Sequence, residues 1–207
     1  MTQGVLDKII DDLNDIFDSD GELLAALYGS VHEYLGTTID WSEQGKVICT
    51  MYDYLEDILA EAPDCFDGED VTPAVSDLFQ VDDSTKKLDN KTSDYFHCTV
   101  ARFIYATKRE RPDIQVAVAF LRKRVKNPNI QDWKKLGRLV QYVRSTIHLP
   151  LVLGSHGSGN MIWSIDTSFA VHMDMKSHTG YCLTLGEGSP ISGSRTQDNT
   201  ARISAES

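Results

Sequence analysis

The centre of this 207-residue chain reads Arg109-Glu110-Arg111-Pro112-Asp113-Ile114-Gln115-Val116-Ala117-Val118. Pro112 stands where a helix tolerates proline best, at its first position, and Asp113 lies near the positive end of the helix dipole. The helix is expected to continue to the basic exit Arg122-Lys123-Arg124, because cations suit the negative end of the dipole. This stretch therefore predicts a helix in the middle of the chain.

Two further helices are predicted beside it. Upstream, Phe96, Val100 and Phe103 share one face of a helical repeat. Downstream, a helix beginning near Ile130 turns its apolar residues inward and leaves its cations for the surface. The inward residues are Trp133, Leu136, Val140 and Val143, and the surface cations are Lys134, Lys135, Arg138 and Arg144. The middle of the chain is thus expected to be helical.

The amino-terminal part predicts one amphipathic helix followed by a hairpin. Apolar residues recur at helical spacing over residues 4–17, and their stripe is expected to lie on a core. Val31–Ile39 is predicted as one strand, and the turn residues 42–45 lead into a second strand, Lys46–Met51. A short helix over residues 54–59 should end near Pro63. The acidic segment that follows, to residue 94, is expected to be mostly loop.

The carboxyl-terminal part predicts short strands. The glycine-rich residues 154–159 are interpreted as a linker or hairpin tip. Three strand-like runs follow, namely Met161–Phe169, Gly180–Leu185 and Pro190–Ser194. The fold class is therefore predicted as α+β, with an amino-terminal helix and hairpin, a helical middle and a small antiparallel sheet at the carboxyl end.

Charge is distributed in blocks. Residues 1–83 carry 2 lysines and 21 acidic residues, a net charge of −19, whereas residues 84–149 carry +10 and the remainder −2. The basic block suits either a phosphate backbone or the acidic block of the same chain. No apolar run approaches the ~18–20 residues of a membrane span, so no membrane partner is expected. The four cysteines lie far apart, and the amino end is acidic. These features favour reduced thiols in an intracellular protein, cytoplasmic or nuclear.

Four motifs occur in the order expected of one known family. They are His32-Glu33-Tyr34-Leu35-Gly36 with Thr38-Ile39-Asp40, Arg111-Pro112-Asp113-Ile114 with Ala117-Val118, Asp132-Trp133-Lys134-Lys135-Leu136 through Thr146, and Ser164-Ile165-Asp166 through Gly180. Together they resemble the pol polyprotein of copia-type retrotransposons, over the carboxyl-terminal part of the reverse transcriptase and the start of the RNase H domain. The resemblance covers residues 32–194.

The resemblance implies a division of the chain. Residues 1–62 would form the end of the palm and a thumb-like segment, 63–93 an acidic connection, 94–153 a basic helical connection, and 160–207 the start of a truncated RNase H-like domain. The basic residues would bind an RNA–DNA hybrid or another nucleic acid. They are Arg109, Arg111, Arg122, Lys123, Arg124, Lys134, Lys135, Arg138 and Arg144.

The resemblance also implies one ancestral catalytic residue. Asp166 corresponds to the first carboxylate that holds the catalytic magnesium ions in the intact family, and Glu206 matches a second carboxylate only with a one-residue shift. Two-metal phosphodiester hydrolysis needs several converging carboxylates. The family's Tyr-x-Asp-Asp polymerase loop precedes the helix at 4–17, and Val81-Asp82-Asp83 is interpreted as a solvated turn. We therefore expect descent from an RNA-directed DNA polymerase and RNase H, no independent catalysis, and no cofactor in this fragment.

Two further hypotheses accompany this one. In the first, the chain is a non-enzymatic module that binds nucleic acid through residues 84–149, with an affinity that falls with salt. In the second, it self-associates, because an unfinished sheet exposes an edge and an apolar face.

Overall fold

The computed structural model describes residues 3–17, 27–82, 84–155, 157, 160–168 and 176–200. Within these residues the chain combines α-helices with two antiparallel sheets, which confirms the predicted α+β class. The helices are α1 (Gln3–Phe17), α2 (Tyr52–Ala60), α3 (Asn90–Thr107), α4 (Gln115–Arg124) and α5 (Ile130–Ser145). The strands are β1 (Val31–Tyr34), β2 (Thr37–Asp40), β3 (Lys46–Thr50), β4 (Leu151–Ser155), β5 (Ile162–Ser168), β6 (Lys176–Thr184), β7 (Gly186–Gly188) and β8 (Ile191–Thr200).

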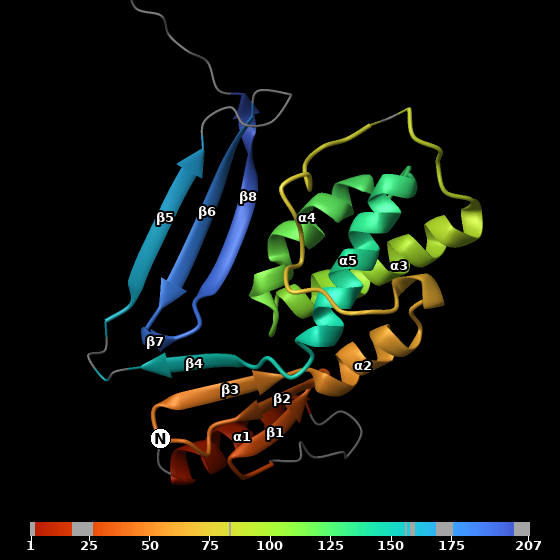
Figure 1. Ribbon diagram of the computed structural model, residues 1–207. Coiled ribbons are helices and arrows are strands. Elements are labelled where there is room, and N and C mark those ends of the chain that lie inside the picture. Colours follow the sequence, from red (N-terminus) through yellow and green to blue (C-terminus); the bar gives the residue numbers. More distant parts are fainter. Residues whose placement is uncertain are drawn as a thin grey trace, which may run out of the picture.

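The core lies between helices α2 to α5, which form one body beside the two sheets (Figure 1). The apolar faces predicted for α3, α4 and α5 meet there, and Phe66 and Leu78 of the acidic segment complete the packing. Its fully buried members include Phe96, Phe103, Leu121, Leu136, Leu139, Val140 and Val143. The acidic segment is therefore mostly irregular, as predicted, but it packs on the helices. Among the described residues between α2 and α3, a short 3₁₀ helix, Asp64–Phe66, is the one helical element.

Local sequence explains where the helices begin. Asp89 caps α3 by accepting a hydrogen bond from the backbone N–H of Thr92. Asn129 and Asp132 form a reciprocal capping box at α5, which satisfies two helix-end donors at once. The predicted helix start at Pro112 is confirmed, although its first turn, Pro112–Ile114, is 3₁₀.

The larger sheet gathers strands from distant parts of the chain in the order β1-β2-β3-β4-β7. Its strand β4 overlaps the glycine-rich segment 154–159, for which the sequence predicts a linker or hairpin tip. That interpretation is wrong for Gly154 and Ser155, because they pair with the hairpin and with β7. The sequence gives no alternation there, and long-range pairing to Lys46 defines the strand.

The prediction of a single strand over 31–39 is also wrong. A two-residue turn at Leu35 and Gly36 divides it into β1 and β2, with Tyr34 opposite Thr37. Both turn residues have positive φ, 51° for Leu35 and 73° for Gly36. Such turns match the right-handed twist of a hairpin, although a leucine rarely adopts that conformation. The Leu35 carbonyl accepts a 2.6 Å hydrogen bond from the Tyr105 hydroxyl on α3, which holds the turn on the helical body.

Helix α1 confirms the predicted helix but not the predicted burial of its stripe. Val5, Ile9 and Leu13 are all more than a third exposed. The buried residues of the described core lie between residues 51 and 143, so the apolar residues of α1 do not belong to it.

The second sheet has the order β5-β6-β8, which confirms the three predicted strand-like runs, with shorter bounds for β5 and longer ones for β6 and β8. In Figure 1 it stands beside the helices, with β5 on the outer side. Strand β7 lies between β6 and β8 in the sequence but pairs with β4 in the larger sheet. The chain therefore connects the two sheets at this point. Within the described residues, no helix combines the length and apolar character that crossing a membrane requires.

Candidate functional site

The predicted nucleic-acid residues fall into three groups that differ in burial. Arg111 is completely buried, whereas Arg122, Lys123 and Lys134 are exposed. The others are partly buried and contact the protein itself: Arg109, Arg124, Lys135, Arg138 and Arg144. The structure therefore divides one sequence-predicted site into an interior contact, an intramolecular surface and an exposed corner.

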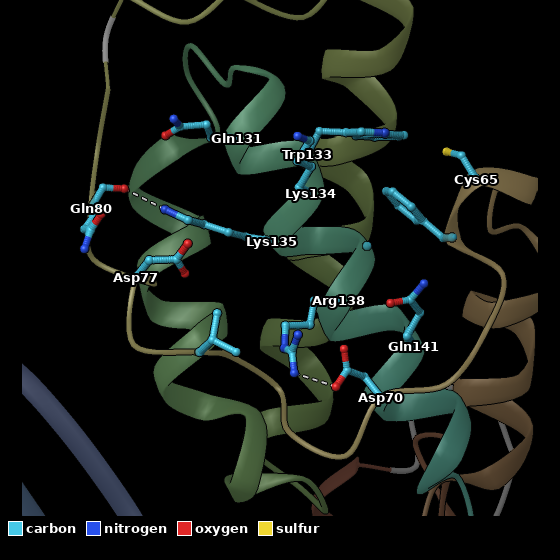
Figure 2. A pocket seen from close by; sticks show the side chains of 13 residues that line it. Cys65, Asp70, Asp77, Gln80, Gln131, Trp133, Lys134, Lys135, Arg138 and Gln141 are labelled. Carbon is cyan, nitrogen blue, oxygen red and sulfur yellow. Dashed lines mark hydrogen bonds and ion pairs between the residues drawn. The ribbon is translucent and has the colours of Figure 1, made fainter.

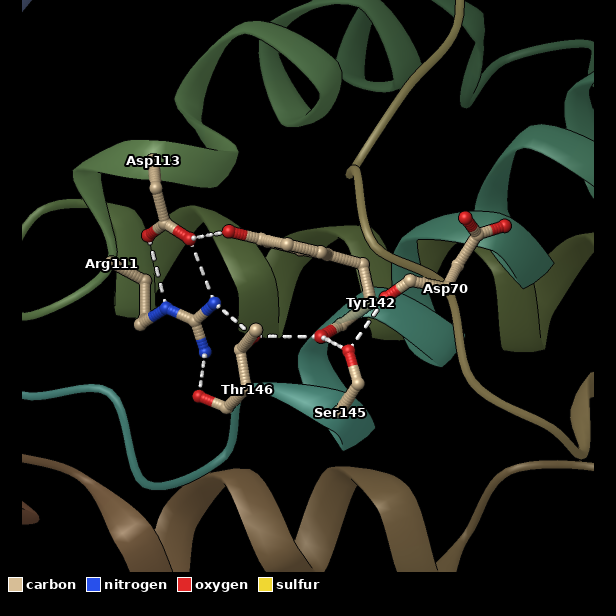
Figure 3. Close-up of polar contacts among 6 residues, drawn as sticks. All are labelled: Asp70, Arg111, Asp113, Tyr142, Ser145 and Thr146. Atoms are coloured by element: carbon tan, nitrogen blue, oxygen red, sulfur yellow. Dashed lines mark hydrogen bonds and ion pairs between the residues drawn. The ribbon is translucent and has the colours of Figure 1, made fainter.

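Arg111 forms the interior contact, shown in Figure 3. Its Nε donates to Asp113 Oδ1 at 2.9 Å, and its Nη2 donates to Asp113 Oδ2 at 2.7 Å. Nη2 also donates to Thr146 Oγ1 at 2.7 Å, and Nη1 to the Thr146 carbonyl at 3.2 Å. Tyr142 completes the group by donating its hydroxyl to Asp113 Oδ2 at 2.9 Å. We call these four residues the arginine clasp; it joins the start of α4 to the end of α5.

Electrostatics explain why the clasp tolerates a buried charge. Burial alone would raise the pKa of Asp113, but hydrogen bonds and charge from Arg111 outweigh it and hold the pKa below its ordinary value. The bidentate geometry matches the planar guanidinium, and Thr146 uses two more of its donors. A lysine at 111 could not reproduce these contacts. The prediction that Arg111 contacts nucleic acid is thus not supported by its position, because solvent does not reach it.

The intramolecular surface joins α5 to the acidic segment. Arg138 pairs with Asp70 at 2.5 Å, and Arg144 Nη1 donates to the carbonyls of Phe66 and Gly68 at 2.7 and 2.9 Å. Lys135 donates to the Gln80 carbonyl at 2.6 Å. The charge pattern left two possible partners for the basic block, a phosphate backbone and the acidic block of the same chain. These contacts agree with the second.

A shallow cleft of about 680 Å³ lies between the two partners of this surface. In Figure 2 the acidic segment crosses α5, and dashed lines join Lys135 to Gln80 and Arg138 to Asp70 across it. Trp133 lines the cleft, and its ring lies 4.4 Å from that of Phe66. Gly137 is required beneath Phe66, because a Cβ there would lie 2.7 Å from the ring. Trp133 is therefore a packing residue, as its helical spacing predicts.

The exposed corner lies where α4 ends and α5 begins. Arg122, Lys123 and Lys126 are exposed at the end of α4, and Lys134 is exposed in the first turns of α5. Arg124 turns inward and pairs with Asp132 at 3.1 Å, which anchors the corner. We call Arg122, Lys123, Lys126 and Lys134 the basic corner. Outside it, Arg109 lies over the Tyr105 ring, 3.6 Å from its centroid.

Asp166 lies in the middle of β5, on the polar side of the strand, and its side chain is exposed. Its partner in β6 is Gly180, whose partner in β8 is Ser194, so no carboxylate stands beside it across the sheet. Among the described residues, no three His, Cys, Asp or Glu side chains converge as a metal site. The described residues around Asp166 therefore do not form the two-magnesium centre of the intact family. Glu206 lies outside the described residues.

The interpretation of Val81-Asp82-Asp83 as a turn agrees with the described residues 81 and 82. The Asp82 carboxylate accepts hydrogen bonds from the hydroxyl and the backbone N–H of Ser84, both of which lower its pKa. This is the local pattern of an Asx turn. Asp83 lies outside the described residues.

Sequence reasoning did not single out Glu110. Its side chain is buried, with 2% of the residue exposed, and burial raises its pKa from 4.5 to about 7. A hydrogen bond from the Met51 backbone and the charge of Arg111 oppose that rise only partly. One feature of the sequence could have pointed to Glu110. Two charged residues, Glu110 and Arg111, stand directly before the proline that starts a helix.

Sequence comparison gives two relatives. The chain is 27% identical over 179 residues to the Uncharacterized mitochondrial protein AtMg00810 of Arabidopsis thaliana, a match that covers 86% of this chain and 72% of the relative. It is 23% identical over 184 residues to the Putative transposon Ty5-1 protein YCL074W of Saccharomyces cerevisiae, covering 86% of this chain and 59% of the relative. The chain thus spans less than two thirds of the yeast protein. No family model matches. No solved structure matches.

Proposed function

Since the chain is a retrotransposon-related protein, we propose that it is a non-catalytic structural segment from the reverse transcriptase and RNase H region of a copia-type pol polyprotein. The observation that carries this proposal is the arginine clasp. It joins two of the motifs on which the resemblance rests, because Arg111 and Asp113 belong to one and Tyr142 and Thr146 to the other. Motifs that bind each other in the interior have a structural reason to occur together.

The surroundings of Asp166 support the non-catalytic part of the proposal. Two-metal hydrolysis requires carboxylates that converge on both ions. Asp166 is exposed, and its neighbours across the sheet are a glycine and, beyond it, a serine. A single exposed carboxylate binds magnesium only weakly, because the ion keeps most of its water.

The test is a pair of activity assays on the purified 207-residue chain. Primer extension and cleavage of the RNA in an RNA–DNA hybrid are measured in magnesium and in manganese. We expect both rates to equal those of the Asp166→Asn variant. Hybrid cleavage by the wild type that the Asp166→Asn variant loses would overturn the proposal, and so would primer extension above background.

The basic corner favours a second function, binding of nucleic acid without catalysis. Its four cations are exposed at the end of α4, in the turn that follows and in the first turns of α5, whereas the cations at 138 and 144 bind the acidic segment. Each phosphate contact releases condensed counterions, so such binding weakens steeply with salt.

Fluorescence anisotropy with a labelled RNA–DNA hybrid at two or more salt concentrations tests this function. Replacing Arg122 and Lys123 with glutamate is expected to weaken binding and reduce the slope of log K against log salt by about 2, roughly 1 for each lost contact. The matched control reverses Lys8 and Lys91, which are exposed elsewhere. If the Arg122/Lys123 variant and the Lys8/Lys91 control lose the same amount of affinity, the effect comes only from net charge. Binding that does not depend on salt would contradict the function.

A further inference from the structure

An exposed aromatic ring lies beside the basic corner. Phe79 belongs to the acidic segment, and 68% of the residue is exposed to solvent. Its ring meets that of Phe120 on α4 edge to face, with the two centroids 5.9 Å apart. Phe120 is part of the core, so it anchors the contact from the interior while Phe79 remains open to solvent. We call Phe79 and Phe120 the aromatic pair.

Contacts on both sides of Phe79 hold its segment against the start of α5. The residue before Phe79 is buried in the core. The carbonyl of Gln80, the residue after it, accepts a 2.6 Å hydrogen bond from Lys135 Nζ (Figure 2). Two residues further on, the Asp82 carbonyl accepts a 3.0 Å hydrogen bond from Nδ2 of Asn129, the cap of α5. The segment that carries Phe79 is therefore fixed beside the turn of the basic corner.

Cations from two helices surround the aromatic pair. Lys135 Nζ of α5 lies 4.7 Å from the centroid of the Phe120 ring. Lys123 follows Phe120 by three residues on α4, so the two side chains share one face of that helix. Asp82 is also exposed nearby, but its carboxylate accepts two hydrogen bonds from Ser84. In a chain with a net charge of −11, this surface combines an open ring with local positive charge.

We propose that the aromatic pair and the basic corner bind single-stranded nucleic acid, with one base stacked on Phe79 and the adjoining phosphates on the cations. Proteins that bind single strands combine stacking side chains with a positively charged path for the backbone. The bases of a duplex are already stacked on each other, so they do not offer a face to Phe79. This inference rests on the nucleic-acid binding proposed above and names the form of nucleic acid that the surface takes.

Charge alone does not select this partner, but the exposed ring does. An acidic peptide would also neutralise the cations, yet its carboxylates have no π-face to stack on an aromatic side chain. Every nucleic-acid base has such a face, so stacking on one ring tolerates any sequence. Affinity is therefore expected to depend on both the bases and the phosphates.

Fluorescence anisotropy of the 207-residue chain separates these two contributions. Three labelled probes of about 12 nucleotides are compared, namely a single-stranded oligothymidylate, an abasic strand with the same number of phosphates, and an RNA–DNA hybrid. Phe79→Ala should raise the dissociation constant for oligothymidylate about tenfold, which corresponds to about 1.4 kcal/mol for one stacked base. The constants for the abasic strand and the hybrid should change less than about twofold.

Phe17→Ala is the matched control, because Phe17 is 67% exposed and lies on α1, outside the basic block. It should leave all three dissociation constants unchanged. Phe79→Trp keeps an aromatic ring at the same position and should bind oligothymidylate at least as tightly as the wild type does. Circular dichroism of the three variants verifies that the fold is retained.

Three results would refute the proposal. The first is a wild-type chain that binds the abasic strand as tightly as oligothymidylate. The second is equal weakening by Phe79→Ala and Phe17→Ala. The third is displacement of oligothymidylate by polyglutamate as effective as that by unlabelled oligothymidylate, which would identify an acidic peptide as the partner. In the first two cases, salt-dependent binding of the hybrid would leave the function of the basic corner intact, whereas failure to bind any probe would contradict both.

Discussion

Replacing Arg111 with methionine is expected to lower the free energy of unfolding by about 3 kcal/mol, the lower end of the range for breaking a buried ion pair. The side chain of Arg111 is fully buried and that of Asp113 is 27% exposed. Methionine fills much of the arginine volume, so the loss comes from polar partners and not from a cavity. Those partners are the Asp113 carboxylate, which keeps only the donor from Tyr142, and the Thr146 hydroxyl and carbonyl oxygens, which lose the donors from Arg111. Urea unfolding followed by circular dichroism measures the change.

Two comparisons separate the clasp from a general effect of charge. Arg109→Met removes a partly exposed arginine that lies over Tyr105, and we expect it to cost less than about 1 kcal/mol. The double variant Arg111→Met with Asp113→Leu should recover part of the stability, because removing both partners leaves no unpaired charge. Equal losses for Arg109 and Arg111, or no recovery in the double variant, would contradict the clasp.

Replacing Glu110 with glutamine is expected to stabilise the protein at pH 8 and to remove a pH dependence near neutrality. The pKa of Glu110 is about 7 in the folded chain and has its ordinary value of 4.5 when unfolded. Between these values the folded state binds more protons, so its stability falls as the pH rises from 4.5 through 7. The fall integrates to roughly 3 kcal/mol for a shift of this size. Glutamine stays neutral and avoids it.

Urea unfolding at intervals from pH 5 to pH 8.5 measures this dependence for both proteins. The free energy of unfolding of the wild type should fall relative to that of Glu110→Gln across the range. Asp113 does not contribute to the difference between the two proteins. Its pKa is lowered, so it titrates below the pH range of the experiment, and it is present in both proteins. Glu61→Gln is the control, since Glu61 is exposed and pairs with Arg102. Parallel curves for wild type and Glu110→Gln would show that Glu110 is ionised throughout.

Periodicity and local chemistry were enough for much of the fold. The apolar spacing over 94–143 predicted the three central helices, and the observed caps at Asp89 and Asn129 use residues that satisfy helix-end donors within a few positions. Strand-like runs of residues predicted the strands of the smaller sheet, including the one that carries Asp166. These signals involve residues that are close in the sequence, so the sequence by itself determined the fold class and the order of the helices.

Only the tertiary structure decided which charged side chains are exposed to solvent and free to contact a partner molecule. Burial and ion pairing depend on residues that lie far apart in the chain. The sequence groups Arg111 with the other cations that would bind nucleic acid. In the structure it is buried, and it donates hydrogen bonds to Thr146, which lies 35 residues further along the chain. Long-range pairing likewise made Gly154 part of a strand, and a turn with leucine in place of the usual asparagine, aspartate or glycine at its first position divided Val31–Ile39. A single sequence specifies the charge of each side chain, but the dielectric around it and the partner it meets follow only from the packed fold.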